Sequence, residues 1–449
     1  MRAALVLALV LASSAIVPVA AADHPGSNKG FKGILDAVGA LQAPLEYNLV
    51  HRLPTVDLKF AQWEAQYPDL VERATIGQTS SGFPLYNIRV TDESVPFDAP
   101  PLSLDTKIRV YLDGGHHGNE FLGVELVMYY LEDLLTKAAA GDEETLRFLA
   151  ETELYATPII NVDGNFLDTR KNSRQVDPNR NYDFMWGGDE GSSGFIGDFT
   201  YRGPAPFSEA ETRANGEFQT QIRPDVVVTM HTGIAEFYWP WGWTHDPSPD
   251  DEMFVSLEAP FENVTNGRVD AMQGAELYIV TGASDDWAYG VLGAAGFTYE
   301  VHEDQFIPAY GQPIPDIIAD QLAGLEFIVK NARHIGAYVE LREQDGVWLA
   351  VNEGWGAATN VTIHVGERTH VIERLARGAS VELPFDATGA TWSYPTLLIN
   401  TSKVRTHSMG DASLAPAAVA TNEVPHAGLA LVALACVGVA LAMRRQRRG

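Results

Sequence analysis

The chain has 449 residues, of which 46% are hydrophobic and 20% charged, a composition typical of a folded protein long enough for two or three domains. It carries 59 acidic residues against 31 basic ones, and this net charge of −28 argues against nucleic acid as a partner, because the surface repels phosphates. The single cysteine, Cys436, lies near the C-terminal end, so the rest of the chain can form no disulfide and no thiolate site.

Both ends of the chain have the pattern of targeting segments. A lone Arg2, an apolar run over residues 3–11 and small residues ending at Ala22 predict a secretory signal peptide over residues 1–22. The uncharged stretch 427–443 predicts a transmembrane helix or a sorting signal that a sortase-like enzyme removes, and the arginine-rich residues 444–449 a basic cytoplasmic tail. We therefore expect an exported protein, anchored at the cell surface with its bulk outside.

Between residues 23 and 340, short apolar strands alternate with amphipathic helices. The pattern predicts strands at residues 108–112, 154–160, 225–230 and 296–299, and helices at 121–138, 208–221 and 316–335. Ser208 and Glu211 have the spacing of a capping box that opens the second of these helices. This alternation predicts an α/β domain with a mostly parallel mixed sheet covered by helices.

After about residue 340 the pattern becomes entirely β. Short alternating runs predict strands at residues 347–351, 361–365, 370–375, 380–383 and 397–399, separated by Gly, Asn and Asp. We expect a small β-sandwich over residues 341–405. Residues 406–426, rich in Ala and polar side chains, are predicted to be a linker.

Candidate metal ligands lie at the ends of the predicted strands. His117 and Glu120 are spaced i, i+3 across a strand-to-helix turn, and His231 ends another strand. Ligands of open α/β sheets bind at the carboxyl ends of the strands, and a His, Glu, His set leaves the fourth position of a tetrahedral zinc site open. For each histidine on its own, a role in the core or in a loop is the alternative.

These residues occur together with several further motifs in a fixed order. The motifs are GGHHGNE at 114–120, NVDG at 161–164, RKN at 170–172, VDPNRN at 176–181, PFSE at 206–209, SDDW at 284–287 and FTYE at 297–300. In these motifs the chain resembles the zinc metallocarboxypeptidases of the carboxypeptidase A and B type. The resemblance extends from about residue 56 to residue 335.

The resemblance implies a role for each residue of the metal site. His117, Glu120 and His231 are expected to bind one Zn²⁺ per chain. Asp177 is expected to accept the ring N–H of His117 and so to fix its tautomer. Glu300 is expected to act as the general base toward a water molecule that zinc acidifies.

The resemblance also implies how a substrate is held. Arg170 is expected to stabilise negative charge on the scissile carbonyl oxygen, while Asn179 and Arg180 bind the free terminal carboxylate. Tyr278 is expected to close over the substrate terminus, with a buried core tyrosine as the alternative. Asp285 lies where basic-specific members of the family carry an aspartate, and it predicts a preference for C-terminal Lys and Arg.

The function expected is that of an exported, membrane-tethered enzyme that hydrolyses the C-terminal bond of peptides or proteins. Two alternatives use the same metal set: a deacylase of N-acyl amino acids and a peptidase of cell-wall peptides. Both substrates carry a free α-carboxylate, so Asn179 and Arg180 suit them as well. The expected partners are peptide or protein C-termini and, through the C-terminal helix, a membrane.

Overall fold

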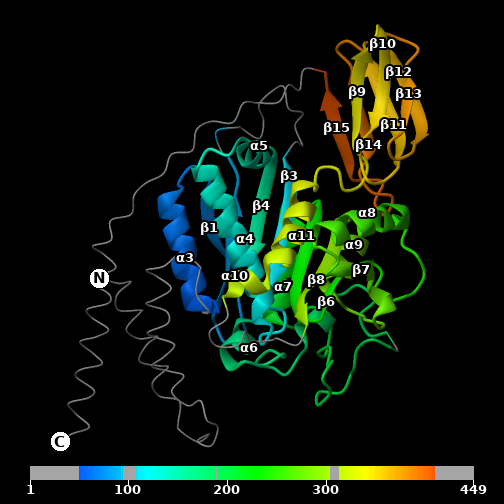
Figure 1. Ribbon diagram of the computed structural model, residues 1–449. Coiled ribbons are helices and arrows are strands. Elements are labelled where there is room, and N and C mark those ends of the chain that lie inside the picture. Colours follow the sequence, from blue (N-terminus) through cyan, green and yellow to red (C-terminus); the bar gives the residue numbers. More distant parts are fainter. Residues whose placement is uncertain (1–49, 93, 95–106, 189, 304–312, 410–449) are drawn as a thin grey trace, which may run out of the picture. The chain divides into compact units, whose positions relative to one another are not determined.

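The computed structural model describes residues 50–92, 94, 107–188, 190–303 and 313–409 (Figure 1). The predicted signal peptide, the uncharged stretch at 427–443, the basic tail and most of the predicted linker lie outside these residues. Within them, none of the helices has the length and apolar character needed to span a membrane.

A mixed eight-stranded sheet forms the centre of the larger α/β part, in the order β1-β2-β4-β3-β5-β8-β6-β7. The pairs β4–β3, β3–β5, β5–β8 and β6–β7 are parallel, and the other pairs are antiparallel. The predicted mixed α/β sheet is thus confirmed. The strands are β1 (Val71–Gln78), β2 (Pro84–Val90), β3 (Ile108–Gly114), β4 (Thr152–Thr157), β5 (Val226–Gly233), β6 (Ala235–Trp239), β7 (Asp270–Gln273) and β8 (Ala295–Glu303).

Helices pack on this sheet and on one another. The long helix α4 packs on β3, β5 and β8, and α11 lies beside it (Figure 1). The short helix α9 packs on β5 and β8, where the site described below is built. The helices are α3 (Leu53–Gln66), α4 (Phe121–Ala139), α5 (Glu143–Glu151), α6 (Val162–Leu167), α7 (Ala210–Ile222), α8 (Asp251–Val264), α9 (Ser284–Gly290), α10 (Ile314–Ile317) and α11 (Ala319–Lys330), with 3₁₀ turns η1 (Pro178–Arg180) and η2 (Gly274–Glu276).

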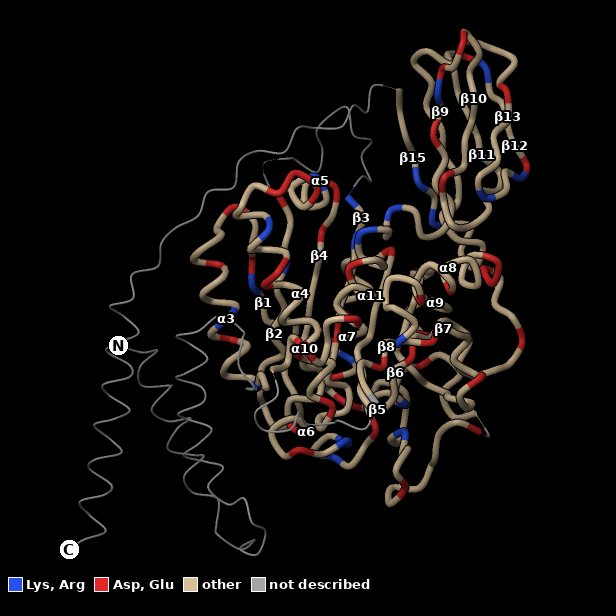
Figure 2. The backbone as a smooth tube through the Cα atoms, viewed as in Figure 1, with Lys and Arg blue, Asp and Glu red and all other residues tan. Residues whose placement is uncertain are grey.

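Charged residues of both signs are spread along the described chain (Figure 2). Figure 2 shows Asp and Glu spread over the helices and loops of the α/β part, with Lys and Arg among them. Some of these charges form ion pairs, as between Arg89 and Glu153 and between Lys59 and Glu132.

Two helix boundaries differ from the sequence-based prediction. Helix α7 begins at Ala210 with Glu209 at its N-cap, so the predicted cap at Ser208 is wrong. The Ser208 hydroxyl instead donates to Glu209 Oε1 and accepts a hydrogen bond from Asn181 Nδ2. The predicted helix over 316–335 is two helices, α10 and α11, and residues after Lys330 form turns.

The C-terminal strands form two small antiparallel sheets, ordered β13-β10-β9 and β12-β11-β14-β15. One apolar core joins them, with Val339 and Ala350 from the first sheet and Ile363 and Tyr394 from the second. The strands are β9 (Val339–Gln344), β10 (Val347–Asn352), β11 (Ala358–Val365), β12 (Arg368–Leu375), β13 (Ser380–Glu382), β14 (Thr391–Pro395) and β15 (Val404–Ser408).

The predicted strand at residues 397–399 is wrong. The backbone N–H groups of Leu398 and Ile399 donate to the two carboxylate oxygens of Asp250, at 2.7 and 3.0 Å. These residues therefore connect the small sheets to the loop before α8 and pair with no strand.

Candidate active site

The turn between β3 and α4 carries His117 and Glu120 close to the sheet. A Cβ atom on Gly118 would lie 2.0 Å from the backbone carbonyl carbon of Gly164, so only glycine allows the turn to approach the start of α6 this closely. Asn161, at the N-cap of α6, also holds the turn, because its Nδ2 donates to His116 O and to Arg170 O.

Three donor atoms converge at this turn. His117 Nδ1 lies 2.7 Å from Glu120 Oε1, and His231 Nδ1, on β5, lies 2.8 Å from Glu120 Oε2. The two Nδ1 atoms are 3.1 Å apart. The structure therefore brings together the three residues that the sequence predicted as metal ligands.

The electrostatics of these residues fit a divalent zinc ion. Burial lowers the pKa of His231, which keeps its imidazole neutral with a lone pair available for a metal. Burial raises the pKa of Glu120, but His117 and His231 outweigh it and hold this pKa below its usual range. Two imidazole nitrogens and one carboxylate are a donor set that zinc prefers in catalytic sites.

Asp177 contacts both a predicted metal ligand, His117, and Arg170. Its Oδ1 lies 3.1 Å from His117 Nε2, and its Oδ2 accepts hydrogen bonds from Arg170 Nε and Nη2 at 3.1 and 2.7 Å. Burial raises the pKa of Asp177, but Arg170 and His117 outweigh it and hold this pKa well below the usual range. The resulting carboxylate orients both the His117 ring and the Arg170 guanidinium.

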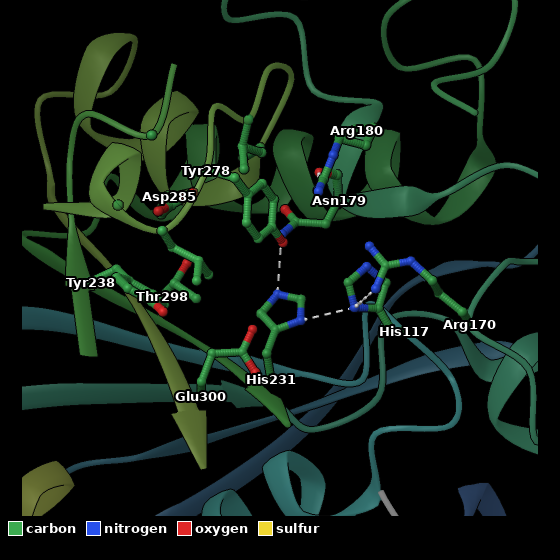
Figure 3. Close-up of a pocket in the computed structure, with 15 residues that line it drawn as sticks. His117, Arg170, Asn179, Arg180, His231, Tyr238, Tyr278, Asp285, Thr298 and Glu300 are labelled. Atoms are coloured by element: carbon green, nitrogen blue, oxygen red, sulfur yellow. Dashed lines mark hydrogen bonds between the residues drawn. The ribbon is translucent and has the colours of Figure 1, made fainter. Parts of the chain in front are cut away.

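A pocket of about 540 Å³, which is open to solvent, lies beside the three donors (Figure 3). It is lined by His117, Arg170, Asn179, Arg180, His231, Tyr238, Gly242, Gly274, Leu277, Tyr278, Val280, Ala283, Asp285, Thr298 and Glu300. The structure thus gathers every predicted substrate-binding and catalytic residue around one cavity.

Asn179 and Arg180 are fixed in their places by η1 and its surroundings. Asn179 Nδ2 lies 3.2 Å from His231 Nε2, and Asn179 Oδ1 accepts the N–H of Ser284 at the start of α9. The Arg180 guanidinium donates to Gly191 O and to Asn179 O and is 2% exposed. A buried arginine held in one orientation suits a planar carboxylate.

Two adjacent acids of α9 have different environments. Asp286 accepts the backbone N–H groups of Gly242 and Trp243, and burial, followed by the charge of Asp285, raises its pKa well above the usual range. Asp285 lines the pocket, and its carboxylate has no hydrogen bond or ion pair to any other described residue. Of these two acids, Asp285 is therefore the one that the pocket presents to a ligand.

Glu300 enters the pocket from β8. It is the register partner of His231 on β5, and its Oε2 is buried with no hydrogen-bond partner among the described residues. Burial, and then the charge of Glu120, raises the pKa of Glu300 well above its usual range. Such a carboxylate can take up a proton and release it again.

Tyr278 lies on the segment between η2 and α9 and is 52% exposed. It lines the pocket, so the alternative of a buried core tyrosine is wrong. Whether Tyr278 moves on binding stays a prediction.

Two site residues were given no role by the sequence analysis. Thr298 forms part of the pocket wall, and Phe199 covers the Arg170 guanidinium with its ring centroid 4.5 Å from Cζ. The aromatic run at residues 237–243 after His231 resembles a loop near the site in the family, with a surface loop packed on itself as the alternative, and the structure places Tyr238 of this run in the pocket wall.

A comparison with known families agrees with this geometry. The profile described as "Zinc carboxypeptidase" matches residues 59–323, which include all three donors and the whole pocket. The chain belongs to the zinc carboxypeptidase family.

Individual zinc carboxypeptidases are similar to this chain over part of their length. Carboxypeptidase B2 of Rattus norvegicus is 25% identical over 60% of this chain and 66% of that protein, and carboxypeptidase B of Astacus astacus is 31% identical over 43% and 70%. Zinc carboxypeptidase A 1 of Anopheles gambiae is 26% identical over 59% and 62%. The chain thus spans somewhat less than two thirds of the rat and mosquito proteins.

Solved structures show the same fold. The crystal structure of thrombin-activatable fibrinolysis inhibitor superposes with a TM-score of 0.57 at 22% identity, covering 68% of this chain and 80% of that one. The bovine form of that inhibitor, in complex with a tick carboxypeptidase inhibitor, gives a TM-score of 0.55 at 24% identity, covering 64% and 98%.

Proposed function

We propose that this protein is a zinc metallocarboxypeptidase that hydrolyses the C-terminal peptide bond of peptides or proteins and prefers C-terminal Lys and Arg. One observation carries the proposal: beside the three zinc donors lies a pocket lined by the buried Arg180, the buried Glu300 and Asp285, which pairs with no other described residue. Zinc, when bound, supplies a Lewis acid that polarises the scissile carbonyl and acidifies a water molecule.

Asn179 and Arg180 restrict the enzyme to chain ends. The Arg180 guanidinium binds the free terminal carboxylate in bidentate fashion, and the Asn179 amide, beside His231, contacts the same group. An internal peptide bond offers no carboxylate here and leaves the buried Arg180 without a negatively charged partner, which disfavours its binding.

Arg170 and Glu300 act on the reacting atoms. Arg170, held by Asp177, presents a fixed positive charge toward the carbonyl oxygen as negative charge develops there. Glu300 Oε2 accepts a proton from the attacking water and returns it to the leaving amine.

Asp285 supports the proposed preference for basic residues. A Lys or Arg side chain that enters the pocket pairs with a carboxylate that is 6% exposed, while an apolar side chain leaves it unpaired. The preference is thus an electrostatic one and depends on the charge of Asp285.

The first experiment measures amino-acid release from peptides ending in Arg, Phe and Glu, with chelator and after zinc is added back. We expect one residue released from the C-terminus, fastest for Arg, with loss on chelation and recovery with zinc. Asp285→Asn should lower the Arg-to-Phe ratio of kcat/KM by roughly two orders of magnitude. Equal rates for Arg and Phe in the wild type would remove Asp285 from the proposal.

The same experiment separates the alternative reactions. If the protein binds one equivalent of zinc and releases nothing from any peptide, the carboxypeptidase proposal is wrong. N-acetylarginine and a cell-wall tripeptide, tested in parallel, would then show whether the site acts as a deacylase or as a cell-wall peptidase.

We also propose that the enzyme is exported and tethered at the cell surface. The apolar run at residues 3–11 and the uncharged stretch at 427–443 support this. Mass spectrometry of the protein from its native membrane fraction checks where the mature chain begins, and we expect a start near Asp23.

A further inference from the structure

The most exposed large apolar side chains of the described residues lie close together in the sequence. They are Phe195 (70%), Phe199 (66%), Leu167 (61%), Ile196 (58%) and Phe166 (55%). All five fall within residues 166–199, on either side of Arg170. Exposed aromatic side chains that gather near a binding pocket point to a surface that another chain covers.

The loop that carries three of these side chains is held against the active site. The Phe199 ring lies 4.5 Å from Arg170 Cζ, and Lys171 Nζ donates to Asp198 O. Asp198 N donates to Phe195 O at 2.9 Å, which closes a tight turn that begins at Phe195 and has Ile196 and Gly197 at its tip. This loop is therefore a fixed wall next to Arg170.

Phe166 and Leu167 lie at the end of α6, outside the loop next to Arg170. Phe166 already stacks on Phe83, with ring centroids 6.2 Å apart. The loop surface formed by Phe195, Ile196 and Phe199 is the stronger candidate.

The pocket gives a bound peptide a direction. In the view of Figure 3, His231 and His117 lie between Asp285 on one side and Arg170 on the other. A terminal side chain at Asp285 places the scissile bond at the metal ligands. The residues that precede this bond then lie on the Arg170 side of the pocket, where the Phe199 ring covers the guanidinium.

We propose that Phe195, Ile196 and Phe199 form a docking surface for aliphatic or aromatic side chains that precede the scissile bond. This inference rests on the proposed function and adds to it a second determinant of substrate choice, on the side of the bond away from Asp285. Its occupant is the substrate peptide, because the surface is continuous with the pocket through the contact between Phe199 and Arg170.

The test compares two blocked tripeptides, acetyl-Leu-Phe-Arg and acetyl-Gly-Gly-Arg, on the zinc-loaded protein. The variant is Phe195→Ser with Ile196→Ser, which leaves Phe199 and Arg170 intact. We expect the wild type to favour the apolar peptide by about tenfold or more in kcat/KM, and the variant to lose most of this ratio while cleaving acetyl-Gly-Gly-Arg normally.

Val255→Ser with Val371→Ser is the matched control, since these valines are 49% and 50% exposed and lie in α8 and β12, outside the pocket. The control should keep the wild-type ratio. A wild-type ratio near one, or an unchanged ratio in the loop variant, overturns the proposal. Loss of self-association in the loop variant without a change in the ratio assigns the surface to a second copy of the chain and also overturns it.

A binding measurement distinguishes this inference from the proposed function. The two tripeptides, carrying fluorescein on the N-terminus in place of the acetyl group, are titrated with chelated protein and followed by anisotropy, which requires no catalysis. Tighter binding of the apolar peptide that the loop variant loses supports the surface even if no peptide is cleaved, and that lack of cleavage then contradicts only the proposed function.

Discussion

Glu300 is the residue whose chemistry is easiest to isolate. It lines the pocket but is not one of the three metal donors. We therefore expect Glu300→Gln to lower kcat by roughly a thousandfold, because the amide cannot accept the proton of water, while zinc content stays at one equivalent. Amino-acid release and metal analysis of the same sample check this.

Glu382→Gln serves as the control for this variant, because Glu382 is an exposed acid on β13 of the small sheets. It should retain wild-type kcat. A Glu300→Gln enzyme with unchanged kcat would exclude Glu300 as the general base.

Asp113 is a buried acid on β3, and its raised pKa gives it a pH-dependent effect on stability. It is fully buried on β3, where burial raises its pKa to about 7 despite hydrogen bonds from Asn215 and Thr229. Between about pH 4 and pH 7 the folded chain binds this proton and the unfolded chain does not, so stability falls as pH rises through this window. The loss amounts to about 4 kcal/mol in total.

Asp113→Asn should remove this part of the pH dependence. Urea unfolding of the chelated proteins at pH 5 and pH 8 measures it, since chelation removes the proton linkage of metal binding. We expect the wild type to lose more stability than the variant between the two pH values. Asp69→Asn, at an exposed acid, should behave like the wild type.

The sequence located the charged residues of the site better than its walls. His117, Asp177 and Glu300 lie in distinctive motifs, and the structure places all of them at one centre. Phe199 was given no role, and the aromatic run that includes Tyr238 kept a surface loop as its alternative, because an aromatic side chain serves equally well in a core, a pocket wall or an exposed surface. Only the folded chain shows which of these each aromatic residue does.

At the scale of elements, the loop after β14 shows how a local pattern can mislead. Residues 397–399 are apolar and read as a strand, but their N–H groups bind Asp250. Asp250 Oδ2 also accepts the hydroxyl of Tyr289 on α9 at 2.7 Å. The partner that decides this conformation is distant in sequence, so no local pattern could reveal it.

Asp250→Ala should therefore lower the free energy of unfolding by roughly 2–4 kcal/mol, because two backbone N–H groups and one hydroxyl lose their acceptor. Urea denaturation measures this. Asp251→Ala, at the neighbouring acid in the first turn of α8, is the control and should cost less than about 1 kcal/mol. Equal losses in both variants would show that Asp250 has no special role.

At the scale of the whole molecule, zinc should stabilise the fold, because its donors come from distant parts of the chain. His117 and His231 are 114 residues apart, so the unfolded chain cannot offer both at low cost. With free zinc about a hundredfold above its Kd, we expect a gain of about 2.7 kcal/mol and a higher Tm.

Thermal denaturation with chelator and with zinc added back checks this gain. His231→Ala should show the low Tm under both conditions. An identical Tm for chelated and zinc-loaded wild type would mean that the three donors do not bind zinc tightly in the folded chain.

The central parallel strands of the large sheet could be predicted from the sequence, whereas several of its antiparallel strands could not. The alternation of strands and helices predicted the four strands of the parallel centre, and the structure adds their order, β4-β3-β5-β8. The antiparallel hairpin β1–β2 and the strand β6, which pairs antiparallel with β8, were not predicted. These strands lie where turn residues or an aromatic run obscured the alternation.

The hydrogen bond between Asp250 and Ile399 also affects the order in which the chain can fold during its synthesis. The two residues are 149 positions apart in the chain. At a synthesis rate of about 5–20 residues per second, Ile399 is made roughly 7–30 s after Asp250. Throughout that interval a buried carboxylate of the catalytic part lacks two of its backbone donors, so this part reaches its full stability only after the last strands have been synthesised.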